Sequence, residues 1–246
     1  MTLKDHFEKS GNWLFRRRSY FPVLILAAAL LGFRGMERRE YDPSLNFLWE
    51  IFCLAIGLFG LSIRIITVGF TPRGTSGRIT EKQKAESLNT TGIYSAVRHP
   101  LYLGNYFMWL SVAMLPQTWW VPVFTTLIFW IYYERIMFAE EEFLRGKFGE
   151  AFLIWAAQTP AFLPSFRKWK APELPFSLRT VLRREPSGLL GLVAVFTLFA
   201  IVKNFISTDS VKIDLFWTVA LSFTALIYVI LVFLKKKTKL LHVPGR

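Results

Sequence analysis

The sequence contains very little cysteine and histidine. Among its 246 residues are a single cysteine, Cys53, and three histidines, His6, His99 and His242. One cysteine can form neither an internal disulfide nor the thiolate set of a structural zinc site, and the histidines are too scattered to indicate a metal cluster. The sequence therefore predicts no metal site and is not that of a disulfide-stabilised secreted domain.

Acidic residues are also scarce: 17 Asp and Glu stand against 30 Lys and Arg, which gives a formal net charge of +13. A basic chain often binds nucleic acid, but 53% of these residues are hydrophobic and the mean hydropathy is +0.36. The charged and apolar residues are separated along the chain, which is typical of membrane proteins. We therefore expect a membrane protein that has no nucleic-acid partner.

Six apolar stretches have lengths that suggest membrane helices. They cover residues 20–33, 45–70, 102–115, 119–138, 188–206 and 215–234. Only Pro116, Gln117 and Thr118 separate the third stretch from the fourth, which leaves room for a tight helical hairpin. We expect an all-α fold, a polytopic integral membrane helical bundle with about six transmembrane helices.

The distribution of Lys and Arg predicts the orientation of this bundle. With six spans, one side of the membrane receives residues 1–19, 71–101, 139–187 and 235–246. These segments hold 23 of the 30 basic residues, whereas the loops on the opposite side hold 4. The positive-inside rule therefore places both termini in the cytoplasm, and the basic tail 235–239 predicts contact with anionic lipid at that face.

Composition divides the chain into four parts. They are an N-terminal basic segment with the first span (1–44), a core (45–166), a proline-containing cytoplasmic linker (167–187), and a two-span hairpin with the basic tail (188–246). The second apolar stretch carries two charges, Glu50 and Arg64. They stand 14 residues apart, about 21 Å along a helix, so they cannot pair with each other.

A first polar motif extends from Leu88 to Asn105. Gly92 and Pro100 predict a turn that leads into the next helix, with Pro100 in its first turn. Arg98 and His99 then lie at the positive end of that helix, which attracts anions, and the Arg98 guanidinium suits a carboxylate or a phosphate. The alternative is that the Arg and Tyr side chains only anchor the helix end at the membrane interface.

A second motif contains the consecutive carboxylates Glu140, Glu141 and Glu142. Carboxylates at the end of a span are costly unless they are solvated or paired, and a solvated helix end is the simpler alternative. Glu140 and Glu141 point about 100° apart on a helix, so at least one can face the bundle interior. The hairpin predicts that they return beside Arg98 and His99, where the mixed charges would suit a zwitterionic small molecule.

These motifs read Gly-x-Tyr-x-x-x-Arg-His-Pro-x-Tyr-x-Gly and Glu-Glu-x-x-Leu-x-x-x-Phe-Gly. In this order they resemble the isoprenylcysteine carboxyl methyltransferase family, which belongs to a wider group with the membrane phospholipid methyltransferases. The resemblance covers roughly Leu45 to Pro164. It implies a cytoplasmic S-adenosylmethionine pocket over the helical hairpin, capped by the polar loop that follows, and makes 45–166 a methyltransferase core.

The resemblance also implies cofactor-binding residues. Carried over by position, they are Leu88, Asn89, Tyr94, His99, Pro100, Leu101, Tyr102, Glu140 for the methionine α-ammonium, and Glu141 in support. From the residues themselves, Arg98 and His99 suit the α-carboxylate, and Tyr94 or Tyr102 can face the sulfonium. Asn105 completes the predicted set.

The expected acceptor is an anionic oxygen of a membrane lipid or a lipidated substrate, which needs positioning more than a strong base. Three arginines are candidates to hold it: Arg135, and Arg73 and Arg78 in the loop 71–78, which could instead be a positive-inside flank. The family places this Arg four residues before the first Glu, whereas Arg135 stands five before Glu140. Phe152 and Trp155 replace two tyrosines of the family.

The chain looks more like prokaryotic members of the family, which predicts a bacterial inner membrane and a lipid headgroup acceptor such as lipid A phosphate. One alternative is a prenylcysteine carboxylate. Another is an NADPH-dependent membrane reductase, which shares the Arg-His-Pro motif but normally lacks the Glu-Glu motif. A non-catalytic membrane scaffold is the third alternative.

Overall fold

The computed structural model describes residues 2–33, 43–72, 85–208 and 214–245. Within these ranges all of the regular secondary structure is helical, as predicted. The helices are α1 (Leu3–Arg16), α2 (Phe21–Phe33), α3 (Pro43–Phe70), the short 3-10 helix η1 (Gly92–Ser95), α4 (Pro100–Met114), α5 (Trp120–Phe148), α6 (Glu150–Gln158), α7 (Leu178–Arg184), α8 (Pro186–Thr208) and α9 (Leu215–Lys237).

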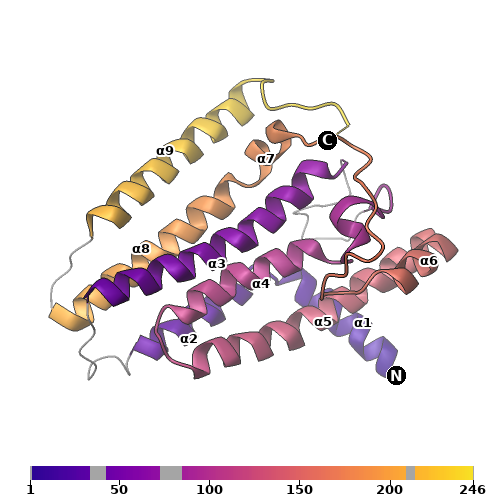
Figure 1. The fold of residues 1–246 in the computed structure, drawn as a ribbon. Coiled ribbons are helices and arrows are strands. Elements are labelled where there is room, and N and C mark those ends of the chain that lie inside the picture. The colour runs from indigo at the N-terminus through magenta and orange to yellow at the C-terminus, as the bar shows by residue number, and fades with distance from the viewer. Residues whose placement is uncertain (1, 34–42, 73–84, 209–213, 246) are drawn as a thin grey trace.

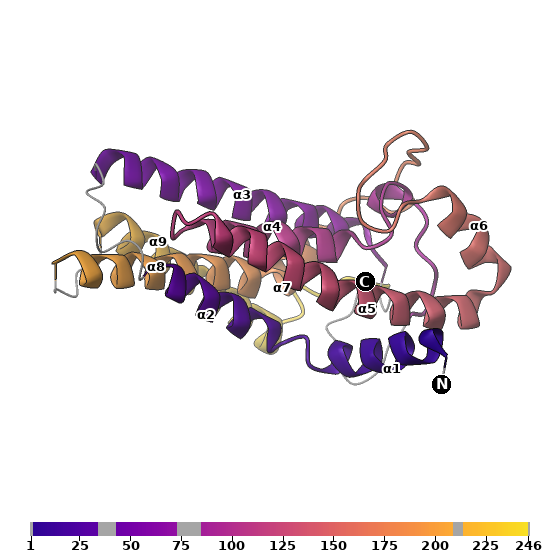
Figure 2. The same cartoon turned by 90° about the horizontal axis from the view of Figure 1, so that it is seen from below.

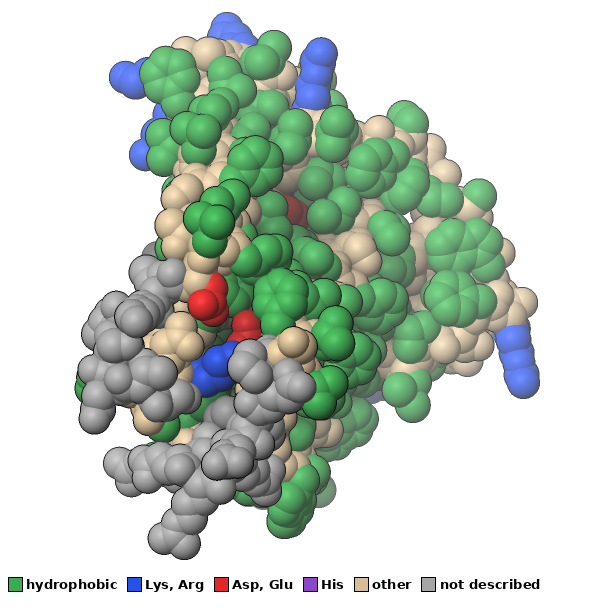
Figure 3. All heavy atoms as spheres, turned by 60° about the vertical axis from the view of Figure 1, so that its left-hand side comes forward, with side chains coloured by type: hydrophobic (Ala, Val, Ile, Leu, Met, Phe, Trp, Pro, Cys, Tyr) green, Lys and Arg blue, Asp and Glu red, His purple; other side chains and the backbone are tan. Residues whose placement is uncertain are grey.

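Each of the six apolar stretches forms a helix: α2, α3, α4, α5, α8 and α9. Among the described residues, three segments are long and apolar enough to cross a membrane, namely 44–70 in α3, 186–206 in α8 and 215–237 in α9, whereas α2 is a shorter apolar helix. The structure is therefore that of a helical protein of the membrane type. The count of six spans stays a prediction. Hydrophobic side chains cover most of the face shown in Figure 3.

The long helices lie along one another, and α1, α6 and both ends of the chain gather at one end of the bundle (Figures 1 and 2). The predicted tight hairpin is present, since α4 ends at Met114 and α5 begins at Trp120. The close approach of α3 to α4 depends on two glycines. A Cβ on Gly104 would lie 2.7 Å from the Gly60 carbonyl oxygen, and one on Gly60 would lie 2.5 Å from the Gly104 carbonyl oxygen.

The two charges within α3 both pair with the C-terminal part of the chain. Glu50 forms an ion pair with Lys203 on α8 and accepts a hydrogen bond of 3.0 Å from the indole Nε1 of Trp217 on α9. Arg64 pairs with Glu185 at the junction of α7 and α8. Buried charges need such partners, so the final helices are attached to α3 at two separate points.

Three helices, α1, α6 and α7, were not expected from the sequence. α1 lies in the N-terminal basic segment and begins with a capping box, in which the side chains of Thr2 and Asp5 each bond the other's backbone N–H. It packs closely on α5, since a Cβ on Gly11 would meet the Arg135 carbonyl oxygen. α7 lies in the region predicted as a linker.

Candidate functional site

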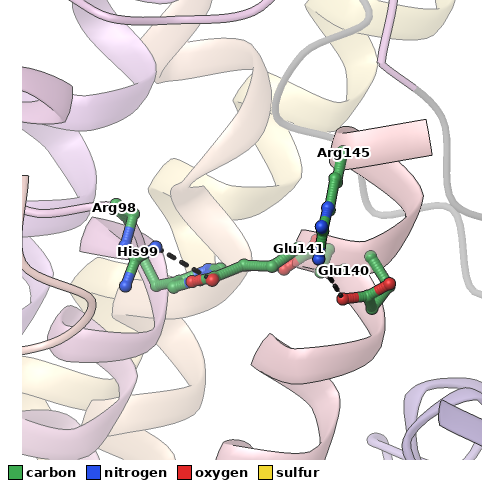
Figure 4. A network of polar contacts seen from close by, with 6 residues as sticks. Arg98, His99, Glu140, Glu141 and Arg145 are labelled. Atoms are coloured by element: carbon green, nitrogen blue, oxygen red, sulfur yellow. Dashed lines mark hydrogen bonds and ion pairs between the residues drawn. The ribbon is translucent and has the colours of Figure 1, made fainter. Parts of the chain in front are cut away.

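The hairpin brings the two polar motifs together, as predicted. Glu141 on α5 accepts a hydrogen bond of 2.9 Å from the Arg98 Nη1, and its other oxygen lies 2.9 Å from the His99 Nε2. The His99 Nδ1 lies 3.5 Å from a Glu140 oxygen. Figure 4 shows the Glu141 side chain reaching from α5 toward Arg98 and His99. One carboxylate therefore holds both basic residues of the first motif.

The backbone before α4 gives these basic residues their direction. Gly92 begins η1 with a positive φ of 57°, a conformation that favours glycine, and Pro100 occupies the first turn of α4. His99 is the residue immediately before that helix. Arg98 and His99 therefore lie at the amino end of α4, where the helix dipole favours anionic groups.

The segment after α6 covers the same turn. The backbone N–H of Arg98 donates to the Pro160 carbonyl at 2.9 Å, and that of His99 donates to the Ala161 carbonyl at 3.2 Å. Part of the predicted polar loop is itself helical, because α6 occupies Glu150–Gln158. The loop that we expected to form the cap therefore contains a short helix followed by an irregular segment, and its capping role stays a prediction.

Burial and nearby carboxylates control the protonation of His99. Burial lowers the pKa of His99, but the hydrogen bonds and negative charges of Glu140 and Glu141 outweigh it and raise the pKa above its ordinary value. His99 is 7% exposed. A protonated imidazole here keeps Glu141 paired and adds positive charge to the site.

The aromatic side chains around this pair are neutral and largely shielded. Burial, and then the negative charge of Glu140, raise the pKa of Tyr94 well above its ordinary value, although the Asn89 side chain and the Arg184 charge oppose this shift. Tyr102 stacks on His99, with ring centroids 5.6 Å apart and planes at 15°. The two tyrosines provide uncharged aromatic surfaces beside the charged groups.

Two polar groups of the site remain available. Glu140 keeps 28% of its side chain exposed, although it lies 3.5 Å from the His99 Nδ1 and accepts a hydrogen bond from the Tyr102 hydroxyl. The Arg98 Nε–H is buried and has no hydrogen-bond partner within the described residues. An acceptor and a donor of opposite charge thus belong to the same cluster, since Glu140 contacts His99 and Arg98 precedes His99 in the chain.

Phe152 and Trp155, which stand where the family often has tyrosines, support the site through contacts between α6 and η1. Trp155 on α6 donates from its indole Nε1 to the Tyr94 carbonyl at 3.0 Å. Phe152 packs against Trp155 with ring centroids 5.8 Å apart, and both side chains are buried. Here the substituted positions attach α6 to η1 instead of presenting hydroxyl groups.

The remaining predicted residues fall into two places. Leu88, Asn89 and Leu101 are half-buried beside η1 and at the start of α4, and Pro100 is buried. Asn105 lies further along α4, where its side-chain oxygen accepts a hydrogen bond of 2.6 Å from Arg64 Nη1.

The structure does not bring Arg135 to this cluster. Its Nη1 donates to the Ser10 hydroxyl at 3.1 Å, and its guanidinium lies 4.5 Å from the Phe7 ring centroid. Both partners belong to α1, which the sequence did not predict. Arg73 and Arg78 lie outside the described residues.

Sequence reasoning missed Glu185. It binds Arg64, which in turn binds Asn105 of the first motif. A carboxylate beside Pro186 in an apparently polar linker gives no sign of burial, although an arginine within an apolar stretch does signal that some acidic partner exists.

Comparisons with known proteins agree with these motifs. The phospholipid methyltransferase family model matches residues 51–151. The cobalt-zinc-cadmium resistance protein CzcN of Cupriavidus metallidurans is 30% identical over 157 residues, which are 62% of this chain and 66% of that protein.

Two protein-S-isoprenylcysteine O-methyltransferases are also similar. The protein from Schizosaccharomyces pombe is 26% identical over 125 residues, 49% of this chain and 52% of its own, and the one from Xenopus laevis is 30% identical over 132 residues, 52% and 46%. The chain thus spans about half to two thirds of the length of the curated relatives it matches. The comparison with solved structures gives no match.

The matched residues include both motifs and the whole of the Arg98, His99, Glu140 and Glu141 cluster. On this evidence residues 51–151 match the phospholipid methyltransferase family, and the chain is similar to isoprenylcysteine methyltransferases.

Proposed function

We propose that this protein is an S-adenosylmethionine-dependent methyltransferase that acts on an anionic oxygen of a membrane-embedded lipid acceptor. The observation that carries the proposal is the pairing of Glu141 with both Arg98 and His99. This pairing holds the basic residues in place and leaves Glu140 for a ligand.

The residues at the cluster fit the ends of such a cofactor. Its methionine part carries an ammonium and a carboxylate, so it needs an acceptor and a donor of opposite charge within one small site. Glu140 supplies the carboxylate, and the buried, unpartnered Arg98 Nε–H supplies the donor. Tyr94 and Tyr102 offer aromatic faces to a cationic sulfonium.

When bound, S-adenosylmethionine supplies an electrophilic methyl group that an anionic oxygen can take directly. Transfer to an oxygen that is already anionic would release the neutral thioether S-adenosylhomocysteine and would require no proton to be removed. The chain therefore contributes by orientation and exclusion of water. Arg98, His99 and Glu140 orient the donor, while Tyr94 and Tyr102 shield the reacting end.

For the acceptor we favour a lipid headgroup phosphate, such as that of lipid A, in a bacterial inner membrane with both termini cytoplasmic. The second candidate is a prenylcysteine carboxylate, which the names of the two isoprenylcysteine methyltransferases favour. Both acceptors present an anionic oxygen on a membrane-anchored group, so the chemistry at the site is the same.

Calorimetry with S-adenosylhomocysteine tests the donor site in the purified, detergent-solubilised protein. Glu140→Gln removes one charge at nearly constant size and should weaken binding about tenfold to a hundredfold, as expected for loss of a charge-assisted hydrogen bond. Glu142→Gln is the matched control, since Glu142 pairs with Lys4 and Arg145 instead. Equal affinities in the two variants, or no binding by the wild type, would reject the proposal.

Transfer of a labelled methyl group then identifies the acceptor. The enzyme is offered bacterial membrane lipids in one reaction and a farnesyl-cysteine analogue in another. Label in a phosphate-bearing lipid supports the first candidate, whereas label confined to the farnesyl-cysteine analogue supports the second.

A further inference from the structure

A cavity of about 290 Å³ lies between α4 and α8, with Arg64 of α3 at one end. We call it the α4–α8 groove. It lies outside the charged cluster described above, and one of its walls belongs to the C-terminal helices beyond the family match at 51–151. The question is which kind of molecule fits it.

The α4 side of the groove changes from polar to apolar along the helix. Its lining residues are Asn105, Met108, Trp109 and Val112. Their spacing of three or four residues places them on one face of α4. Asn105 binds Arg64, so the polar end of this face is the end nearer to His99.

The α8 side follows the same order from its first turn. Its lining residues are Ser187, Gly188, Gly191, Leu192 and Val195. Gly191 is exposed, and a Cβ built on it would meet no atom within 4 Å. Gly191 leaves open the space that a larger side chain would occupy, and the apolar residues Leu192 and Val195 lie farther along the helix.

The groove lies on helices with membrane character. Residues 186–206 of α8 and 44–70 of α3 are long and apolar enough to cross a membrane, so hydrocarbon is the natural neighbour of the mouth at Gly191. Ligand-binding cavities in proteins commonly have volumes of about 300 Å³ or more. A cavity at this lower limit suits one acyl chain better than two. Its lining, which is polar at the Arg64 end and apolar farther along both helices, matches a hydrocarbon chain with a polar end.

The polar end of the groove lies close to the charged cluster. Asn105 on α4 stands six residues after His99, the residue that precedes this helix, which corresponds to about 9 Å along the axis. Arg183 and Arg184 form the last turn of α7, immediately before Glu185 and the groove. The positive charge of Arg184 also opposes the rise in the pKa of Tyr94 that burial causes. An anionic headgroup at this end would therefore meet positive charge.

We propose that the α4–α8 groove binds one acyl chain of a membrane lipid, with the headgroup at the Arg64 end and the chain tip toward Val112 and Val195. The groove would then position the acceptor lipid for methyl transfer, and this part of the inference rests on the proposed function. Binding of the chain itself does not require the donor site, so the two ideas fail separately.

Photolabelling tests the groove directly. The full-length protein is reconstituted into phosphatidylethanolamine vesicles that contain phosphatidylglycerol with a diazirine near the end of one acyl chain. Labelled peptides should include 105–112 and 187–195. Gly191→Phe fills the mouth and should reduce this labelling about tenfold, which corresponds to about 1.4 kcal/mol of binding.

Gly146→Phe is the matched control, because Gly146 is also an exposed helical glycine with no atom within 4 Å of an added Cβ. It should label like the wild type. Gly191→Leu provides a smaller obstruction if the Phe variant does not fold. Undiminished labelling in both Gly191 variants would overturn the assignment. So would labelling of the groove peptides that is no stronger than labelling of α9. Stronger labelling of the groove by a diazirine farnesyl-cysteine analogue than by the phospholipid would overturn it as well.

A second readout connects the groove to transfer. Gly191→Phe should lower methyl transfer to membrane lipid about tenfold by raising the lipid KM, while the affinity for S-adenosylhomocysteine stays that of the wild type. Wild-type transfer by this variant would overturn the acceptor role. If the wild type binds no S-adenosylhomocysteine but the groove is labelled, the proposed function fails and the lipid site stands.

Discussion

Arg64 on α3 donates two hydrogen bonds to Glu185, from Nε and Nη2, each 2.9 Å long. The Glu185 residue is 5% exposed, so this ion pair is largely removed from solvent. It joins the part of the chain that matches the family to the C-terminal helices, and it lies at the polar end of the α4–α8 groove.

We expect the loss of either partner alone to destabilise the protein. Arg64→Met or Glu185→Met leaves one buried charge uncompensated and should reduce the free energy of unfolding by about 3–5 kcal/mol. The double variant removes both charges and should be less destabilised than the sum of the two. Thermal unfolding in detergent measures all three, and additive losses would contradict a direct coupling.

The pKa of His99 predicts a pH dependence of stability. Because the folded-state pKa lies above 6.5, protonated His99 stabilises the fold fully below about pH 6.5 and loses this contribution as pH rises through the folded-state value. The unfolding temperature of the wild type should therefore fall more steeply above pH 6.5 than that of His99→Gln. His242→Gln is the control, and a slope unchanged by His99→Gln would contradict the assignment.

The close contact of α3 and α4 predicts opposite effects for two glycine substitutions. Gly104→Ala places a Cβ 2.7 Å from the Gly60 carbonyl oxygen and should destabilise the protein by about 1–3 kcal/mol through overpacking. Gly146→Ala meets no atom within 4 Å and should stabilise its helix by up to about 1 kcal/mol. Chemical or thermal unfolding of both variants gives the signs.

We expect Trp155 to stabilise the protein and the site through its hydrogen bond to η1. Trp155→Phe removes the donor to the Tyr94 carbonyl and should cost about 1 kcal/mol of stability, with weaker S-adenosylhomocysteine binding because η1 becomes less constrained. Trp169→Phe changes a half-exposed indole and serves as the control. Calorimetry that finds the two variants equal would show that the Trp155 bond does not support the site.

Local signals in the sequence predicted much of the fold. Apolar length located six helices, and Pro116 to Thr118 predicted the hairpin that joins α4 to α5. Because a tight hairpin returns the chain beside its starting point, the approach of Glu141 to Arg98 followed from the sequence as well. α1 was not predicted because it is not an apolar stretch, although the pair Thr2 and Asp5 is a capping signal.

The sequence by itself determined that the chain is basic and apolar in separate segments, is helical, and carries two motifs that meet across a hairpin. These properties depend on composition and on contacts between neighbouring helices. The tertiary structure decided which partners the remaining charges take. Arg135 faces α1, Glu50 meets Lys203, and Arg64 meets Glu185 across 121 residues. Such pairings depend on how distant helices rotate and pack, because a buried charge specifies only that it needs a partner, and not where in the chain that partner stands.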